Sequence, residues 1–275
     1  SRFLEPVHVK NEYITSNDFV VEMALVFVPY LPEYITKAAE PYLQKEIRDK
    51  VQDAVTIARE LGDDNIPVSI VGLGAYTSIA TRNGETINHY EIPITTGNAY
   101  TVGLTVQGII YAAQKRGVDL STAHVAIVGA GGNIGSVLAQ VLAPRIGRLT
   151  LVGSGIGNQS QFRLQYTRKQ CISEIVRELS KLRESGTDNL NHLGMLAGNI
   201  SAFLKQDASQ LHTDLVSAID DKEHIINKIV DLLPEDVIAK HIILQADFSC
   251  LKAADIVIAA TNSADESLLK PEHVK

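Results

Sequence analysis

The segment HVAIVGAGGNIGS, residues 124–136, constrains the fold of this chain more than any other stretch. Four apolar residues lead into a group of glycines, and a helical pattern follows at 133–147. This order of strand, loop and helix is the context of a dinucleotide-binding fingerprint. Gly129 would permit the tight turn, Gly131 would let the backbone approach a pyrophosphate, and Gly135 would let the helix pack close to the strand. A tight turn that binds no nucleotide is the alternative.

The segments around this loop predict an α/β protein. Further strands are expected at 148–155, 241–246 and 255–263. Residues 160–240 carry mostly helical patterns, so we expect a helical insertion between the second and third strands of the sheet. The whole pattern predicts a Rossmann-type doubly wound parallel sheet at 119–275. A smaller α/β domain at 1–118 would precede it.

The preceding domain contains three recognisable elements. A helix is expected at 38–62, a short strand at 67–74 and a second helix at 98–117, which ends at Gly117. Residues 1–37 are mixed in pattern and are interrupted by prolines, so no element is predicted there.

Composition excludes several classes of protein. The formal net charge of −7 argues against a nucleic-acid partner, which would require a basic face. No apolar run reaches the ~18 residues of a membrane span. Cys171 and Cys250 form no CxxC motif, which favours a reducing, cytoplasmic environment. The eight histidines show no metal-ligand spacing, so no metal site is expected. Because residue 1 is Ser and the chain stops where an α/β domain would continue, we expect a fragment of a longer protein.

The end of the second strand bears on the choice of cofactor. The strand ends LTLVGSG, with Ser154 and no acid. A carboxylate at this position would hold the ribose 2′-hydroxyl of NAD and would repel the 2′-phosphate of NADP, so the sequence favours NADP over NAD. The basic residues Arg163, Arg168 and Lys169 follow. The sequence does not distinguish which of them would reach the phosphate, and a solvated helix face is the other interpretation.

The residues expected to contact the cofactor lie at the ends of three strands. Thr261 and Asn262 follow a buried strand at the edge where α/β proteins bind ligands, although an ordinary polar turn is the alternative. The complete predicted set is Gly129, Gly131, Gly132, Asn133, Ile134, Gly135, Ser154, Thr261 and Asn262.

Three motifs in fixed order resemble one family. They are VGLGAYTSI (71–79), ITTGNAYT (94–101) and VAIVGAGGNIGS (125–136), and they are similar to the cyanobacterial long-chain acyl-[acyl-carrier-protein] reductases. The resemblance covers roughly 20–155 and resumes at LKAADIVIAATNS. It implies a role in fatty acid metabolism, in which NADPH reduces an acyl thioester to an aldehyde through a cysteine-bound acyl intermediate. It implies an acyl thioester substrate and suggests an acyl carrier protein as a partner. A homo-oligomer is compatible with it.

The resemblance also suggests roles for residues of the first domain. Thr95, Thr96 and Asn98 would lie in a cleft between the domains and orient the nicotinamide or the thioester carbonyl; capping of the next helix is the alternative. A second set, Tyr76, Thr77 and Ser78, would line the same cleft on the substrate side, or would form an ordinary polar turn.

The chain departs from the family pattern in three respects. Ser154 or Gly155 stands where the family has a basic residue, and the helical block 160–240 has no recognised counterpart. Neither Cys171 nor Cys250 matches the acylated cysteine, so the nucleophile is expected outside this chain. Two alternatives stay open: another NAD(P)-dependent dehydrogenase of the shikimate or methylene-tetrahydrofolate dehydrogenase type, or a non-catalytic nucleotide-binding module.

Overall fold

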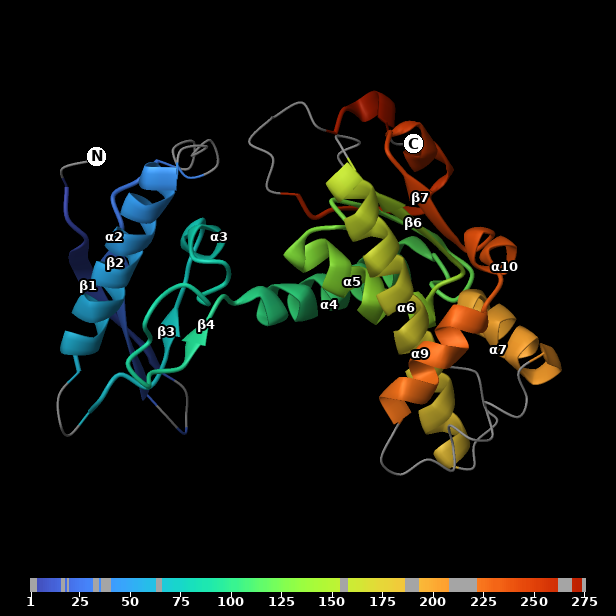
Figure 1. Ribbon diagram of the computed structural model, residues 1–275, viewed down its shortest axis with the longest axis horizontal. Helices are drawn as coiled ribbons and strands as arrows, with labels where there is room; N and C mark the ends of the chain where they lie inside the picture. The colour runs from blue at the N-terminus through green and yellow to red at the C-terminus, as the bar shows by residue number, and fades with distance from the viewer. Residues whose placement is uncertain are drawn as a thin grey trace. The chain divides into compact units, whose positions relative to one another are not determined.

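The chain forms two compact units, Ser1–Ala99 and Tyr100–Lys275 (Figure 1). The computed structural model describes residues 4–15, 18, 20–31, 35, 41–62, 66–153, 158–185, 193–207, 222–261 and 269–273. The sequence predicts a domain boundary at 118–119, but the compact units divide near the start of helix α4 (Asn98–Arg116). The difference arises because Val102 and Ile109 of this helix belong to the core of the second unit.

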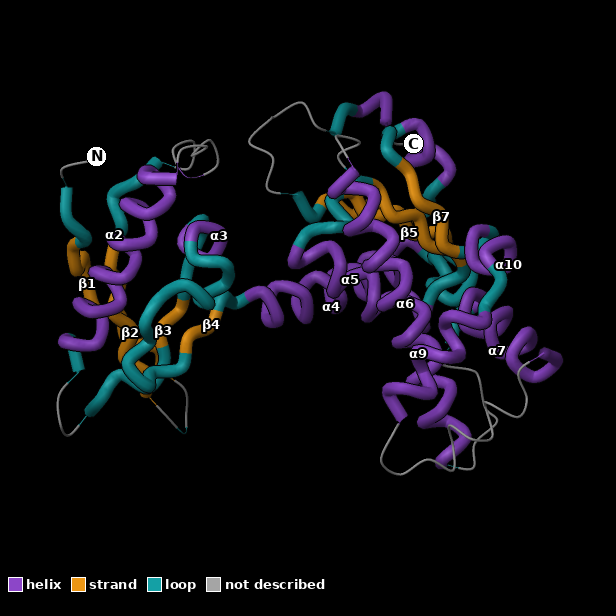
Figure 2. Tube along the Cα trace, viewed as in Figure 1, coloured by secondary structure: helices purple, strands orange, loops and turns teal. Residues whose placement is uncertain are grey.

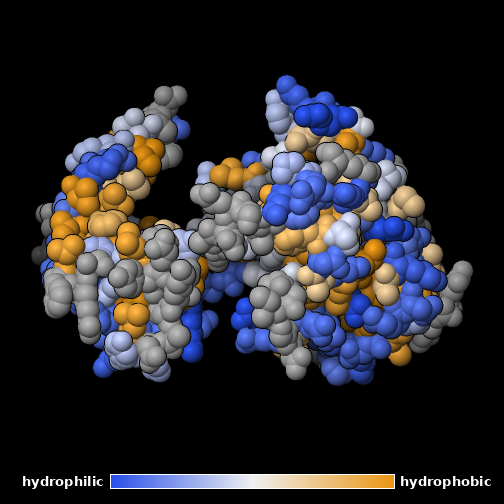
Figure 3. All heavy atoms as spheres, turned by 90° about the horizontal axis from the view of Figure 1, so that it is seen from above, coloured by the Kyte–Doolittle hydropathy of each residue, from blue (hydrophilic) through white to orange (hydrophobic). Residues whose placement is uncertain are grey.

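The first unit begins with an antiparallel hairpin of β1 (Val7–Thr15) and β2 (Val20–Phe27). The expectation that residues 1–37 form no helix or strand is therefore wrong. Apolar and polar residues alternate only over Val7–Lys10, and β2 is apolar except for Glu22, so the two-residue period that identifies a half-buried strand is too short to recognise. Nearly every hairpin residue is exposed, and Figure 3 shows apolar atoms at the surface of this unit on the left.

A long helix supplies most of the core of the first unit. Helix α2 (Pro41–Glu60) lies within the predicted 38–62, and its residues Val51 and Val55 pack against Leu73 and Ile87. The strand predicted at 67–74 is only two residues long, β3 (Val71–Gly72). It is short because its parallel partner, β4 (Ile94–Thr95), offers only two residues for pairing.

The second unit is built on a parallel sheet of four strands (Figure 2). They are β5 (His124–Val128), β6 (Arg148–Val152), β7 (Ile242–Gln245) and β8 (Ile256–Ala259). Their spatial order is β7-β6-β5-β8, which in chain order is third, second, first, fourth. This order is compatible with a Rossmann-like fold. All four strands lie within the ranges that the sequence predicts.

Helices cover one face of this sheet. Helix α5 (Asn133–Leu142) connects β5 to β6 and is followed by the short 3-10 helix η1 (Ala143–Arg145), which contains Pro144. The predicted helical block contains α6 (Asn158–Glu184), α7 (Met195–Asp207), α9 (Lys222–Leu232) and α10 (Glu235–Ala239). Ile175, Leu196 and Ile229 of these helices share one core with Ile127 of the sheet. The block is therefore the layer that completes this face.

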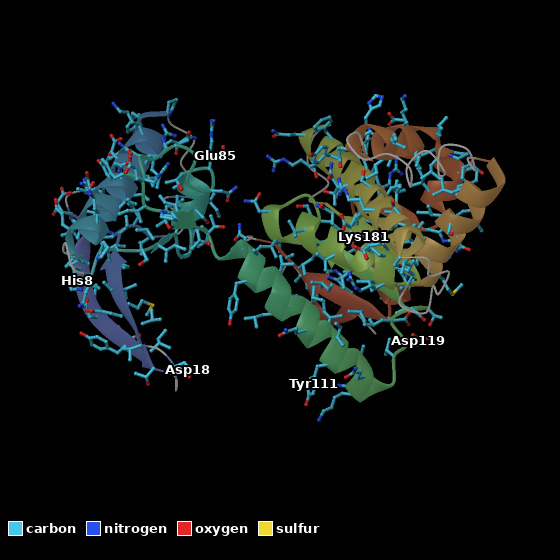
Figure 4. The ribbon with its side chains drawn as sticks, turned by 90° about the horizontal axis from the view of Figure 1, so that it is seen from below. His8, Asp18, Glu85, Tyr111, Asp119 and Lys181 are labelled. Atoms are coloured by element: carbon cyan, nitrogen blue, oxygen red, sulfur yellow. The ribbon has the colours of Figure 1, made fainter. Side chains whose placement is uncertain are left out.

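The opposite face of the sheet has a smaller cover. Ala126, Val128 and Val152 pack there against Leu251 of the turn η2 (Ser249–Ala253), and η3 (Pro271–His273) lies beside η2. Asp119, labelled in Figure 4, follows α4. Its carboxylate accepts hydrogen bonds from the amide and the hydroxyl of Ser121 at 2.9 and 2.8 Å. This turn leads the chain from α4 to β5. Within the described ranges, no helix is both long and apolar enough to cross a membrane.

Candidate functional site

The glycine loop joins the carboxyl ends of three neighbouring strands. Gly129 has a φ of +80°, and a Cβ there would lie 2.5 Å from the carbonyl oxygen of Ala260, just after β8. The amides of Gly129 and Ala130 both donate to the carbonyl of Val152 in β6, at 2.9 and 3.2 Å. The amide of Gly132 donates to the carbonyl of Gly129 at 2.9 Å and closes the turn. Only glycine fits at 129, since the position combines a left-handed backbone with a close contact.

Gly135 brings the start of α5 close to the end of β5. A Cβ on this residue would lie 2.3 Å from the carbonyl oxygen of Gly129 and 3.0 Å from the Cα of Ala130. Both neighbours are backbone atoms, so they cannot move aside as a flexible side chain would. This is the close approach of helix and strand that the fingerprint requires of its last glycine.

The first turn of α5 leaves amide groups available for an anion. Its N-cap is Gly132, which has no side chain to accept a hydrogen bond. In the part of the chain that the structure describes, the amides of Gly131, Ile134 and Gly135 have no protein acceptor. A Ser or Asp cap would have occupied one of the first-turn amides. Open amides at the positive end of a helix dipole are the features with which proteins bind phosphate groups.

Helix α6 lies directly against this loop. The hydroxyl of Thr167 donates to the carbonyl of Ala130 at 3.2 Å, inside the protein. A Cβ on Gly131 would lie 3.1 Å from the Cβ of Arg163. The missing side chain at 131 therefore makes room for α6, a reason for this glycine that the sequence pattern alone does not reveal.

The three basic residues that the sequence predicts near the cofactor all lie in α6, and they have different surroundings. Arg168 forms a two-pronged ion pair with Glu235 at 2.7 and 2.9 Å, and Lys169 pairs with Asp231 at 2.8 Å. Arg163 is exposed, and no ion pair or hydrogen bond from its side chain is present within the described ranges.

The remaining predicted cofactor residues surround the loop only in part. Thr261 follows β8 and is exposed, and its Cα would lie 3.2 Å from a Cβ on Gly129. Asn133 starts α5 and is exposed at the surface. Ser154 and Asn262 lie outside the described residues.

The polar residues predicted to orient the substrate belong to the first unit, where the threonine side chains form hydrogen bonds with backbone amides. The hydroxyl of Thr95 accepts from the amide of Gly97 at 3.2 Å, and the hydroxyl of Thr96 accepts from the amide of Asn98 at 3.4 Å. Both hydrogen bonds shape the turn into α4. Each hydroxyl retains its own proton for donation, so the predicted role in orienting a substrate stays a prediction.

The substrate-side residues lie around a short helix, α3 (Thr77–Ala80), whose N-cap is Tyr76. The hydroxyl of Thr77 donates to the carbonyl of Gly74 at 2.7 Å, and that of Ser78 donates to Ala75 at 3.4 Å. Ser78 is buried, whereas the other two are half-buried. A polar turn accounts for these contacts, and contact with a substrate stays a prediction.

Neither cysteine has the surroundings of a nucleophile. Cys171 is fully buried in the main core, and burial raises the pKa of its thiol far above the ordinary range. Burial and the nearby Asp247 raise the pKa of Cys250, whose thiol donates to the Asp247 carbonyl at 3.4 Å. Cys250 belongs to η2, which enters β8 at its amino end, away from the glycine loop.

His124, the first residue of β5, has hydrogen-bond partners that give its ring a structural role. His124 starts β5, and its ring nitrogens lie 2.7 Å from the hydroxyl of Thr150 and 3.0 Å from the carbonyl of Ala253. In the described segments, no group of three or more His, Cys, Asp or Glu side chains gathers as metal ligands would.

Comparison with known proteins gives one partial similarity. No protein-family profile matches the chain. The chain is 32% identical over 126 residues to the long-chain acyl-[acyl-carrier-protein] reductase of Synechococcus elongatus. The match covers 43% of this chain and 34% of that protein, so the chain matches about a third of its relative's length. The similarity agrees with the resemblance carried by the three motifs.

Proposed function

We propose that this chain carries the cofactor-binding part of an NADPH-dependent oxidoreductase that acts on acyl thioesters and forms fatty aldehydes. The observation that carries the proposal is the set of open amides on the glycine loop, where the ends of β5, β6 and β8 meet. A strand order compatible with a doubly wound Rossmann sheet and the partial similarity to a reductase support it.

In this proposal the loop binds the pyrophosphate of the cofactor. The amides of Gly131, Ile134 and Gly135 donate to phosphate oxygens, and the N-terminal dipole of α5 favours the negative charge. Thr261 and Asn262 would contact the ribose next to the nicotinamide. When bound, a reduced nicotinamide supplies a hydride.

The first unit would orient the reacting carbonyl. Thr95 and Thr96 have hydroxyl protons, and Asn98 has an amide group that can donate. Donors aimed at an oxygen that gains negative charge stabilise the transition state by roughly 3–4 kcal/mol each. Because neither cysteine is an activated thiol, an acyl-enzyme intermediate would need a nucleophile outside this chain.

Titration calorimetry with NADPH tests the proposal. Gly131→Val would fill the space beside the open amides and contact Arg163, so we expect NADPH affinity to fall at least tenfold. Gly198→Val in α7 is the matched control, because a Cβ at Gly198 meets nothing within 4 Å. Wild-type affinity in a folded Gly131→Val variant would contradict the proposal.

A nucleotide-binding module without catalysis is the second candidate. The burial of Cys171 and the place of Cys250 in η2 favour it, since no thiol lies at the loop. A rise in melting temperature with NADPH is expected for both candidates. Consumption of NADPH in the presence of acyl-CoA or acyl carrier substrates would separate an acyl thioester reductase from such a module. The same result would argue against a dehydrogenase of the shikimate or methylene-tetrahydrofolate type, which acts on other substrates.

A further inference from the structure

We infer that Arg163 binds the 2′-phosphate of NADPH and so sets the preference for NADPH over NADH; this inference rests on the proposed function. The basic residue that would read this phosphate thus comes from one face of α6 and not from the end of β6.

The position of Arg163 follows from its neighbours on the helix. Residues 160, 163, 164 and 167 share one face, because they are three or four positions apart. A Cβ on Gly153, directly after β6, would meet the side chains of Ser160 at 2.8 Å and Leu164 at 2.9 Å. Thr167 on the same face hydrogen-bonds to Ala130 after β5. Arg163 therefore lies between the carboxyl ends of β5 and β6.

This place matches the adenosine side of a bound dinucleotide. In doubly wound sheets the pyrophosphate lies on the first strand–helix loop, and the ribose that bears the 2′-phosphate lies at the end of the second strand. Here those strands are β5 and β6. A long side chain that starts beside Gly131 and projects from the helix after β6 can reach that region.

The ion pairs of α6 exclude the other two candidates. Glu235 holds both prongs of Arg168, and Asp231 holds Lys169. Arg163 is exposed, and within the described ranges no carboxylate pairs with it. A guanidinium with all its donors available is suited to a phosphate, which it can bind through two parallel hydrogen bonds.

The stem of Arg163 also explains why the position is well defined. Its Cβ lies 3.1 Å from the Cβ position of Gly131 and its Cδ lies 3.9 Å from it. The aliphatic part thus packs on the loop while the charged end extends into solvent. These contacts position the stem of Arg163 beside the loop.

The test measures NADPH and NADH affinities by titration calorimetry for the wild type, Arg163→Gln and Arg168→Gln. Arg163→Gln keeps much of the stem and removes the charge, so NADPH affinity should fall about 10-fold to 100-fold, the range for a hydrogen bond between charged groups. NADH affinity should change less than about twofold, because NADH has no 2′-phosphate. The control Arg168→Gln should keep the wild-type ratio of the two affinities.

Each outcome bears on the inference. Equal weakening of NADPH and NADH would place Arg163 on the pyrophosphate and overturn the inference, and unchanged affinities would overturn it too. In both cases the proposed function would stand, provided that the wild type binds NADPH and Gly131→Val does not. If the wild type binds neither nucleotide, the proposed function and the inference fail together. If Arg163→Gln does not fold, Arg163→Lys serves instead, and it should reduce the NADPH preference by a smaller factor.

Discussion

Adding a methyl group at Gly135 should destabilise the protein through close packing at the glycine loop, although alanine has the higher helix propensity. In Gly135→Ala the new carbon would lie 2.3 Å from the carbonyl oxygen of Gly129 and 2.9 Å from its carbonyl carbon. No side-chain rotation relieves this contact, so α5 must move away from β5. Gly198→Ala is the matched control, because it also adds a methyl group near the start of a helix of the same unit and meets nothing within 4 Å.

The expected magnitudes have opposite signs. Replacing an unhindered helical glycine by alanine stabilises a protein by up to ~1 kcal/mol, so Gly198→Ala should gain about that amount. Overpacking a filled interior costs roughly 1–3 kcal/mol, and a contact with backbone belongs at the upper end of that range. The free energies of unfolding of the two variants should therefore differ by about 2–4 kcal/mol.

Urea unfolding followed by circular dichroism measures this difference directly. A thermal melt should show it as a gap of about 4–16 °C, since 1 kcal/mol corresponds to roughly 2–4 °C for a unit of this size. NADPH affinity should fall in Gly135→Ala only, because the open amides belong to the displaced turn. If both alanine variants unfold at the same urea concentration, the close approach of α5 to β5 does not decide stability and the reasoning is refuted.

Three further outcomes are expected. Burial, then the charges of Arg148 and Lys240, lower the pKa of His241, so the unfolded chain binds more protons than the folded one. The contribution of His241 to stability should therefore be fully present above pH ~6.5 and should fall modestly as the pH drops through that value. Urea unfolding at several pH values should show this dependence in the wild type and not in His241→Gln. Intact-mass spectrometry after incubation with a long-chain acyl-CoA should show no covalent adduct; a stoichiometric adduct on Cys171 or Cys250 would contradict the assignment of both as inert. Ser154→Asp should erase or reverse the preference for NADPH in calorimetry, because a carboxylate repels a 2′-phosphate, and equal binding of NADH and NADPH by the wild type would refute this reasoning.

Local signals account for what the sequence predicts well. The strands of the second unit are short apolar runs that end at glycine or polar turns, so their type follows from neighbouring residues alone. The glycine loop is recognisable for the same reason. The hairpin of β1 and β2 is missed because alternation is confined to the first residues of β1 and β2 is almost wholly apolar. The length of β3 is overestimated because it depends on β4, more than 20 residues away.

The choice among basic residues could not be made from sequence. Arg163, Arg168 and Lys169 are all basic and close together in the sequence. Their surroundings differ because Glu235 pairs with Arg168 and Asp231 pairs with Lys169, and both acids lie more than 60 residues further along the chain. The packing of α9 on α6 brings Asp231 to Lys169, and Glu235 at the start of α10 reaches Arg168, and no local pattern reveals either contact.

The central place of β5 in its sheet has a consequence for hydrogen exchange. This strand pairs with β6 on one side and β8 on the other, and its residues Ala126 and Ile127 are fully buried. Their amide protons should exchange with solvent only when the whole unit unfolds. The open amides of Gly131 and Ile134 begin just beyond the strand and should exchange quickly. A nucleotide that occupies them would slow their exchange selectively, so deuterium uptake over a few loop residues reports binding without any catalytic turnover.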